Sequence, residues 1–381
     1  MSKKLSNKQH GKIFDDILKQ MTQTKGVRHV IMAAETMDGS FAWAKAEGIA
    51  HPDGTPMDVE TPFWIASITK LYIACCILKF HEDGLLSIDD LITKHLPLDL
   101  IKGIHTMGCT DNTGKLTIRH LLTHSSGIPD YLEIKADGEK TIIDQVVEVR
   151  DMSWSVKEII KIVREENSPL FPPQSLDKDK YKIRYSDTNF QLLTAIIEAT
   201  AGKPAEEAYR DIIFKPLNLN STYLPGSVPL KPTKKASTVW IGDVAFEDKP
   251  KALRSFGDLN STVKDQVSFM RALLEGKLFE NKETLDFMKK NWQTFGFGLS
   301  PISPGWPIQY SMGMMRFKTP RFLSPFQDVP EIIGHTGAVG SWLFYCPLYD
   351  LILSGSVSQA TAAAAPFKYV PKLLAALGKS Q

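Results

Sequence analysis

Apolar and polar positions near the start of the chain follow first a helical and then a strand-like period. The apolar residues over 12–25 recur with the spacing of an amphipathic helix. Two strand-like segments, 27–34 and 40–46, flank the dipeptide Asp38-Gly39, which favours a hairpin turn. The pattern therefore predicts a helix followed by a β-hairpin.

A second apolar segment predicts a buried helix, and strand patterns return late in the chain. Leu71–Leu78 carries no charged residue, and Gly84 follows it as a typical helix stop. From there to about residue 250, proline and glycine punctuation predicts helices and loops. With the N-terminal hairpin, the late strands predict an antiparallel sheet. These strands are expected at 295–299, 310–317, 331–336, 341–345 and 351–357, before a final helix over 367–377.

Composition narrows the class of protein. The 381 residues are 43% hydrophobic, and 45 basic against 43 acidic residues give a net charge of +2, which favours neither a nucleic-acid nor a membrane-surface partner. The most apolar late stretch, 342–357, is interrupted by Pro347, Asp350 and Gly355 and is too short to cross a bilayer. The first ten residues lack an apolar signal core, so we expect a soluble cytoplasmic protein of one or two domains. A secretory leader missing from this sequence is left open.

Cysteine and histidine patterns do not indicate a metal site. Cys75 and Cys76 are neighbours in the apolar helix, and no Cys-x-x-Cys spacing occurs, so reduced thiols are expected. His120 and His124 have the i, i+4 spacing of a zinc helix but lack its glutamate, which favours packing or capping roles.

The spacing Ser-x-x-Lys occurs three times, and its context differs each time. Ser175–Lys178 lies in a polar run behind two prolines and predicts a solvated loop, while Ser261–Lys264 resembles an ordinary helix start. Ser67 and Lys70 instead stand where the apolar helix begins. There, positions i and i+3 share a face, and the helix N-terminus favours an oxyanion beside Ser67. Burial is expected to lower the pKa of Lys70 and supply a neutral base.

Two later blocks, Tyr185–Asp187 and His335–Gly337, complete the parts that a serine acyl-transfer enzyme requires. A serine hydroxyl needs a base, a proton donor for the leaving group and donors for the oxyanion. Either block alone would be read as a turn or a loop. Their order along the chain is what makes them informative.

With these blocks the chain resembles the class C β-lactamase-like superfamily of penicillin-recognising serine hydrolases. The superfamily includes family VIII carboxylesterases and D-alanyl-D-alanine carboxypeptidases. The resemblance covers roughly residues 10 to 375. It also includes the segments Leu116–Tyr131, Ile213–Leu217, Tyr310–Met314 and Gly334–Gly337 in family order.

The resemblance implies an α/β (α+β) fold of the β-lactamase/transpeptidase type, with an antiparallel sheet flanked by helices. Residues 1–80 and 255–381 would form the α/β domain from both chain ends. Residues 81–254 would form a mainly helical inserted domain, with the active site in the cleft between the two.

The resemblance also implies residue roles. Ser67 would be the acylated nucleophile, Lys70 its base and Tyr185 the second member of a proton relay. The amides of Ser67 and Ala338 would form the oxyanion hole. Gly337, without a side chain on an edge strand, would let substrate backbone approach closely.

Two positions depart from the β-lactamase pattern, and both concern substrate binding. Asp187 stands where asparagine is common, so it can pair with Lys70 but offers no amide donor. His335 replaces lysine, which removes a permanent cation for a carboxylate; with Thr336 and Gly337 it completes the expected substrate-binding set. The alternative is that Asp187 only caps a helix beginning near Asn189. Asp258, in the segment Ser255–Ser261 that resembles a family loop near the cleft, is interpreted as a turn residue outside the catalytic set.

The leading interpretation is a cofactor-independent and metal-independent carboxylesterase acting through an acyl-enzyme. Its partners would be small esters, amides or short peptides, and a homo-oligomer is left open. The alternatives are a D-amino-acid peptidase or amidase with weak β-lactamase activity, and a non-catalytic penicillin-binding or ligand-sensing module. An apolar rim for acyl groups is a further option at residues 170–173, 240–242 and 292–306.

Overall fold

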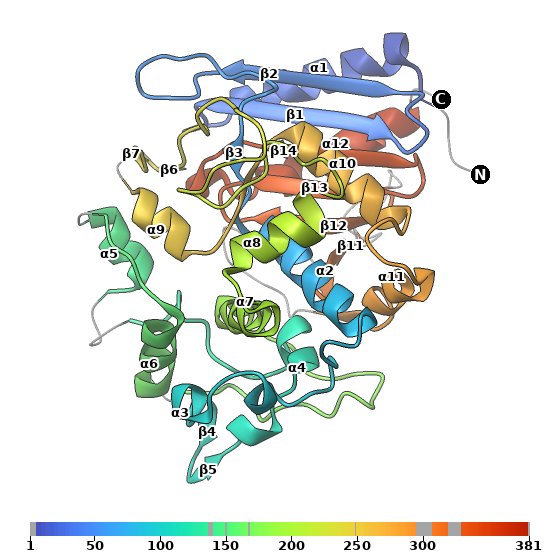
Figure 1. Cartoon of the computed structure of the whole chain (residues 1–381). Helices are drawn as coiled ribbons and strands as arrows, with labels where there is room; N and C mark the ends of the chain where they lie inside the picture. The colour runs from blue at the N-terminus through green and yellow to red at the C-terminus, as the bar shows by residue number, and fades with distance from the viewer. Residues whose placement is uncertain are drawn as a thin grey trace.

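A computed structural model describes residues 5–135, 140–148, 151–166, 168–247, 249–294, 307–318 and 329–379. Figure 1 shows a sheet with helices on both faces and a mainly helical part extending from one of them. The expected strand at 295–299 lies outside the described residues. No helix within the described ranges is both long and apolar enough to cross a membrane.

The sheet is antiparallel throughout and draws strands from both ends of the chain, as predicted. The N-terminal hairpin pairs with the last strand, for example through Ile31 opposite Ser356, and that strand pairs with the next through Trp342 opposite Gly355. The order is β2 (Ala42–Gly48), β1 (His29–Thr36), β14 (Leu351–Ser356), β13 (Ser341–Cys346), β12 (Ile332–Gly337), β11 (Met315–Phe317), β10 (Ile308–Tyr310) and β9 (Gln293–Thr294).

Alternating side chains divide the apolar residues between the two faces of the sheet. Val30 and Met32 point to one face, where α1 (Asn7–Thr22) and α12 (Ala365–Lys379) pack side by side. Ile31 and Ala33 point to the other face, which α10 (Val263–Leu274) covers and where α2 (Thr69–Glu82) begins. Successive residues alternate because the side chains of a strand have a period of two.

The segment 310–317, expected as one strand, is two strands joined by a turn. Gly313 has φ +71°, and a Cβ there would lie 2.5 Å from the Cβ of Ala74 and 2.9 Å from the carbonyl oxygen of Lys70. Only glycine combines this backbone conformation with so close an approach. The turn therefore packs directly on the helix that carries Lys70.

The mainly helical part lies on the face of the sheet where α2 begins (Figure 1). The helix α2 (Thr69–Glu82) extends into it and packs against α7 (Asp187–Ala201), which also contacts α4 (Ile118–Leu122). The remaining helices are α3 (Leu98–Ile101), α5 (Ile142–Glu148), α6 (Val156–Glu166), α8 (Ala205–Tyr209), α9 (Pro250–Ser255) and α11 (Lys282–Met288). Short strand pairs are β3 (Phe63–Trp64) with β8 (Asn260–Ser261), β4 (Thr106–Met107) with β5 (Thr110–Asp111), and β6 (Trp240–Ile241) with β7 (Val244–Ala245).

Candidate active site

The turn that carries Ser67 is strained and clamped from both sides. Ala66, just before the serine, has φ +49°, a left-handed conformation that costs a non-glycine residue about 1–3 kcal/mol. The amide of Ile65 donates to the carbonyl of Leu259 (2.9 Å), and the Ser341 hydroxyl donates to the carbonyl of Ile65 (2.8 Å). The turn continues as a short 3-10 helix, Ala66–Ile68, into α2. The surrounding structure therefore holds Ser67 in a fixed position.

Lys70 links the serine to a carboxylate. Its Nζ donates to Ser67 Oγ at 3.0 Å and forms an ion pair with Asp187. The lysine side chain is 2% exposed, whereas the Asp187 side chain is 23% exposed. Ser186 occupies the N-cap position of α7 and Asp187 is the first helical residue. The side chain of Asp187 is thus directed at Lys70, in contrast to the capping alternative.

Tyr185 contacts the same serine. Its hydroxyl hydrogen-bonds the Ser67 side chain, and its ring centroid lies 5.0 Å from Lys70 Nζ. His124 packs on this ring at 4.5 Å, and its Nδ1 accepts the amide of Ser186 (3.2 Å). The structure therefore brings Ser67, Lys70, Tyr185 and Asp187 together, with His124 supporting the tyrosine.

The charges of the site differ from the expectation for Lys70. Burial alone would lower the pKa of the Lys70 ammonium, but the charges of Asp187 and then Asp258 outweigh burial and raise it. The prediction of a lowered lysine pKa is wrong for this reason. Burial, followed by the charge of Asp187, raises the pKa of the Tyr185 phenol well above its usual value. Both groups therefore hold their protons at neutral pH.

His335 is a neutral histidine in this site. Burial, followed by the charge of Lys70, lowers its pKa to about 3. Its Nδ1 lies 2.7 Å from the carbonyl oxygen of Thr336, which can only accept, so Nδ1 carries the ring proton. His335 thus supplies no positive charge near neutral pH.

The strand β12 brings Gly337 against the turn that carries Ser67, and Ala338 follows as the first residue of the turn to β13. A Cβ on Gly337 would lie 2.2 Å from Ser341 Oγ and 2.6 Å from the carbonyl oxygen of Ile65, so any side chain would push the strand and the turn apart. In the described sheet, residues 335–337 pair with β13 alone, because pairing with β11 ends at Gly334. Ala338 is exposed, and its amide finds no acceptor among the described residues. This leaves an amide donor directly after the strand edge formed by residues 335–337.

Two buried carboxyl groups belong to this region and were missed by sequence reasoning. The Asp258 carboxyl hydrogen-bonds the Thr69 side chain, and burial raises its pKa to about 7. Asp130 accepts the amide of Asp187 (3.1 Å), and burial followed by the charge of Asp187 raises its pKa well above the usual range. The likeness of segment 255–261 to a family loop near the cleft was the one signal for Asp258.

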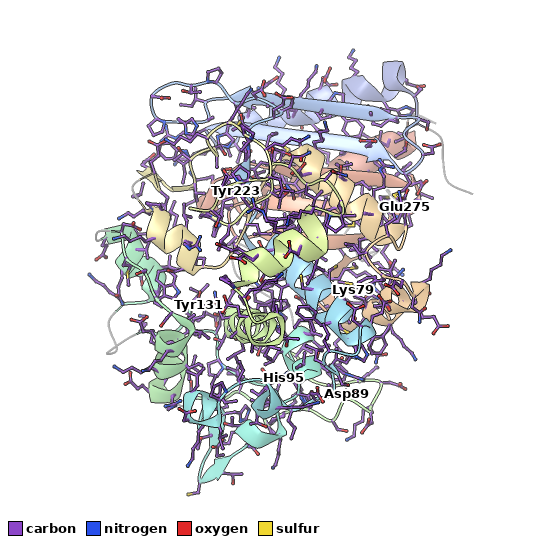
Figure 2. All side chains as sticks on the ribbon, in the orientation of Figure 1. Lys79, Asp89, His95, Tyr131, Tyr223 and Glu275 are labelled. Atoms are coloured by element: carbon purple, nitrogen blue, oxygen red, sulfur yellow. The ribbon has the colours of Figure 1, made fainter. Side chains whose placement is uncertain are left out.

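The helix α7 also holds the loop after α4. The amide of Tyr131, which Figure 2 shows beside α7, donates to the hydroxyl of Thr188 at 3.0 Å. Tyr310 lies near as well, with its ring edge-on to His335 at 5.9 Å and its phenol within the electrostatic reach of Lys70. No sequence pattern singled out Tyr310 beyond its place in a family-like segment.

Other candidates from the sequence lie elsewhere. His120 forms a capping box with Thr117 at the start of α4, and no cluster of metal-ligating residues occurs within the described residues. Trp240 packs under Arg28 at 4.8 Å and Trp292 under Arg316 at 4.7 Å, which are packing roles; Trp306 lies outside the described residues. The buried Cys75 and Cys76 are free thiols with raised pKa values.

Comparison with known proteins adds three findings. The family described as Beta-lactamase matches residues 14–369. The chain is similar to penicillin-binding protein 4* of Bacillus subtilis, at 24% identity over 84% of this chain and 66% of that protein, so it spans just under two thirds of that relative. Among solved structures it resembles a D-stereospecific amidohydrolase from Streptomyces sp. (TM-score 0.67, 25% identity, 91% of this chain and 94% of the other). It also has the fold of a D-amino acid amidase from Ochrobactrum anthropi SV3 (TM-score 0.74, 21% identity, 98% and 99% covered).

Proposed function

The chain belongs to the beta-lactamase family of serine hydrolases, and from that premise we propose that it is a carboxylesterase that hydrolyses small esters through an acyl-enzyme on Ser67. The observation that carries the proposal is the 3.0 Å hydrogen bond from Lys70 Nζ to Ser67 Oγ, on which the Tyr185 hydroxyl also converges. A nucleophile, a base and a proton carrier within hydrogen-bond reach are what acyl transfer needs.

The proposed reaction has two halves. Ser67 Oγ attacks the ester carbonyl while the amides of Ser67 and Ala338 hold the oxyanion. The serine proton enters the relay of Lys70 and Tyr185, and Tyr185 passes a proton to the leaving alcohol. Water then cleaves the acyl-enzyme by the same transfers in reverse. Because both relay groups rest in their protonated forms, the relay must lose a proton before it can accept one, so the rate should rise with pH.

The polar groups around the relay support neutral esters over β-lactams. Asp187 offers an anion where an amide donor would hold an acylamido chain, and His335 offers a neutral ring where a cation would hold a carboxylate. In this proposal Thr336 and Gly337 contact the neutral part of the substrate along the strand edge. His335 itself would supply no positive charge to a substrate carboxylate beside the scissile bond.

A D-amino-acid amidase is the second candidate, and one observation favours it. Two carboxyl groups, Asp187 and Asp258, act on the Lys70 ammonium, and a third, Asp130, lies against Asp187. Such a site suits a substrate with a free amino group better than one with a free carboxylate. The similarity to a D-stereospecific amidohydrolase is consistent with this candidate.

One panel of substrates separates these activities. We would measure hydrolysis of p-nitrophenyl esters, D-aminoacyl p-nitroanilides and a cephalosporin, and follow the intact mass of the protein. The proposal predicts rapid ester turnover that is lost in Ser67→Ala. Faster turnover of D-aminoacyl anilides than of esters would select the amidase. A stable acyl adduct without turnover would identify a penicillin-binding or ligand-sensing module.

The domain division is also a proposal: residues 1–80 with 255–381, and residues 81–254 as the helical insertion. It is supported by the origin of the site residues, since Ser67 and Lys70 come from the first part while Tyr185 and Asp187 come from the second. Limited proteolysis, with the site trapped by a phosphonate, would test whether the two parts separate at these boundaries.

A further inference from the structure

The loop before β8 ties a carboxyl group to the nucleophile helix. Leu259 hydrogen-bonds the Ser67 region twice: its carbonyl accepts the amide of Ile65 (2.9 Å), and its amide donates to the hydroxyl of Thr69 (2.9 Å). Asn260 is held on its other side by paired backbone hydrogen bonds with Tyr223. The residue just before Leu259 is Asp258, and its carboxyl also hydrogen-bonds the Thr69 side chain. The backbone therefore fixes this carboxyl next to Lys70.

Lys70 already has one carboxylate partner, so Asp258 is not required to compensate the charge of the buried ammonium. Asp187 already forms an ion pair with Lys70, and burial keeps His335 and His124 neutral. A second buried carboxyl beside one ammonium costs desolvation that the existing ion pair does not offset. Such an arrangement is more common at functional sites than in purely structural packing.

The groups that interact with Asp258 come from α2, from α7 and the residue before its cap, from α8 and from the loop after α4. Lys70 opposes its charge, Asp187 repels it, and the hydroxyl of Thr69 donates to it. Its charge in turn acts on three tyrosines, Tyr131 in the loop after α4, Tyr185 before α7 and Tyr209 of α8. Among these groups, Lys70 and Tyr185 are the two that would carry the serine proton.

We propose that Asp258 is a positioning residue for the Ser67, Lys70 and Tyr185 relay, and that its carboxylate sets the pH above which the relay can accept the serine proton. This inference rests on the proposed function. An anionic Asp258 stabilises the protonated forms of both Lys70 and Tyr185, so it moves the acidic limb of activity to higher pH. Burial raises the pKa of Asp258 to about 7, so the carboxyl ionises over the pH range in which the enzyme would work. Its titration then couples to that of the relay and broadens the limb.

The test is the pH dependence of Ser67 labelling by a neutral fluorophosphonate, because the probe itself does not titrate. Asp258→Asn keeps the size and the hydrogen-bonding capacity toward Thr69 but removes the charge. We expect its acidic limb to shift downward by about 1 pH unit and to become steeper. Asp258→Glu restores the charge and should return the limb toward the wild-type position. Asp83→Asn, at the far end of the same helix, removes a remote charge and should leave the limb unchanged.

The outcomes separate the two proposals. A limb that stays in place in Asp258→Asn, or a uniform loss of labelling at every pH, would overturn the role of Asp258 while leaving the Ser67 mechanism intact. Labelling that persists in Ser67→Ala would instead refute the proposed function itself. If Asp258→Asn does not fold, Asp258→Ser carries the same prediction, and a limb that does not move in that variant overturns the inference equally.

Discussion

Two Ser-x-x-Lys sequences stand side by side in this molecule and have opposite surroundings. Ser67 follows β3 and Ser261 ends β8, and these two strands pair with each other through Phe63 opposite Ser261. Lys70 is buried and contacts Ser67 at 3.0 Å. Lys264 is exposed, and the Ser261 hydroxyl instead contacts Thr222 at 2.8 Å.

The difference lies in the backbone around each serine. Ser67 belongs to a 3-10 turn that continues into α2, so the residue three positions later rises on the same face. Ser261 is still in extended conformation, and the following Thr262 is an extended N-cap whose hydroxyl accepts the amide of Asp265 (3.1 Å). Residues i and i+3 across a strand end do not share a face. The same four-residue spacing therefore yields a dyad only when the serine is already helical.

The largest expected effect comes from removing the Ser67 hydroxyl, with the Ser261 hydroxyl as its matched control. Ser67→Ala should reduce ester turnover by about 10⁴-fold or more, because no other group can form the acyl-enzyme. Ser261→Ala removes a hydroxyl of the same spacing and should keep turnover within a few fold. Steady-state kinetics and circular dichroism on both variants check this pair. Comparable losses of turnover in the two variants would show that Ser67 is no more important for ester hydrolysis than Ser261.

The two lysines should differ almost as much. Lys70→Ala removes the proposed base and should lower kcat by about 10³-fold, a typical general-base contribution. Lys264→Ala changes an exposed side chain and should be nearly silent. Tyr185→Phe should also be severe, and the double variant with Lys70→Ala should lose little more than either single one, because residues that act as one relay fail together. Multiplicative losses would contradict a shared relay.

Most of the sheet was predictable from the sequence because its central strands are short apolar runs, buried on both faces and bounded by turn residues. The N-terminal hairpin, the strands around Trp342 and Leu353 and the final helix all occur where the pattern expects them. The prediction of a single strand over 310–317 was wrong. The turn at Gly313 depends on a contact with Ala74 of α2, more than two hundred residues away, and no local pattern contains that information.

The site was predictable in its residues but less so in its charges. Ser67, Lys70, Tyr185 and Asp187 were found by motif order, and the structure brings them together. The direction of the Lys70 pKa shift was predicted wrongly because it depends on how many carboxyl groups lie near the ammonium. Asp130 and Asp258 come from loops far apart in the sequence, and only the fold shows that both lie close to Asp187.

The packing of β12 on the Ser67 turn can be broken at Gly337 without removing any group of the proposed relay. Gly337→Ala places a methyl group within 2.6 Å of the Ile65 carbonyl and 2.8 Å of the Ala66 side chain, so the strand must move away from the turn. A displacement of about 1 Å can cost about 10²-fold in rate. Gly114→Ala is the control, because its added Cβ meets nothing within 4 Å and its backbone is not left-handed. Unchanged kcat in Gly337→Ala would mean that this packing does not position Ser67.

The next prediction concerns Asp187, the carboxylate that pairs with Lys70. Asp187→Asn removes the ion pair, so the pKa of Lys70 should fall and the acidic limb of ester hydrolysis should move down by about 1–3 pH units. The asparagine also adds an amide donor, so turnover of a penicillin should improve relative to a p-nitrophenyl ester. The position of the acidic limb and the ratio of penicillin to ester turnover are both measured in one purified variant. If neither moves, Asp187 is a structural residue at the start of α7.

The smallest expected effect concerns His335, which neighbours the same dyad but should take no part in its titration. Its folded-state pKa of about 3 lies below its usual value, so the ring stays neutral from about pH 4 upward and cannot lose a charge as pH rises. Neutral and acidic esters should therefore show the same pH profile between pH 5 and 9, apart from any titration of the substrates themselves, and His335→Asn should not remove a limb from either.

A histidine that bound substrate carboxylates as a cation would give the opposite result. It would make kcat/KM for acidic esters fall as pH rises, in the wild type alone. Finding that limb, and losing it in His335→Asn, would show that substrate binding recharges the ring, and that the Lys70 ammonium does not hold it neutral in the complex.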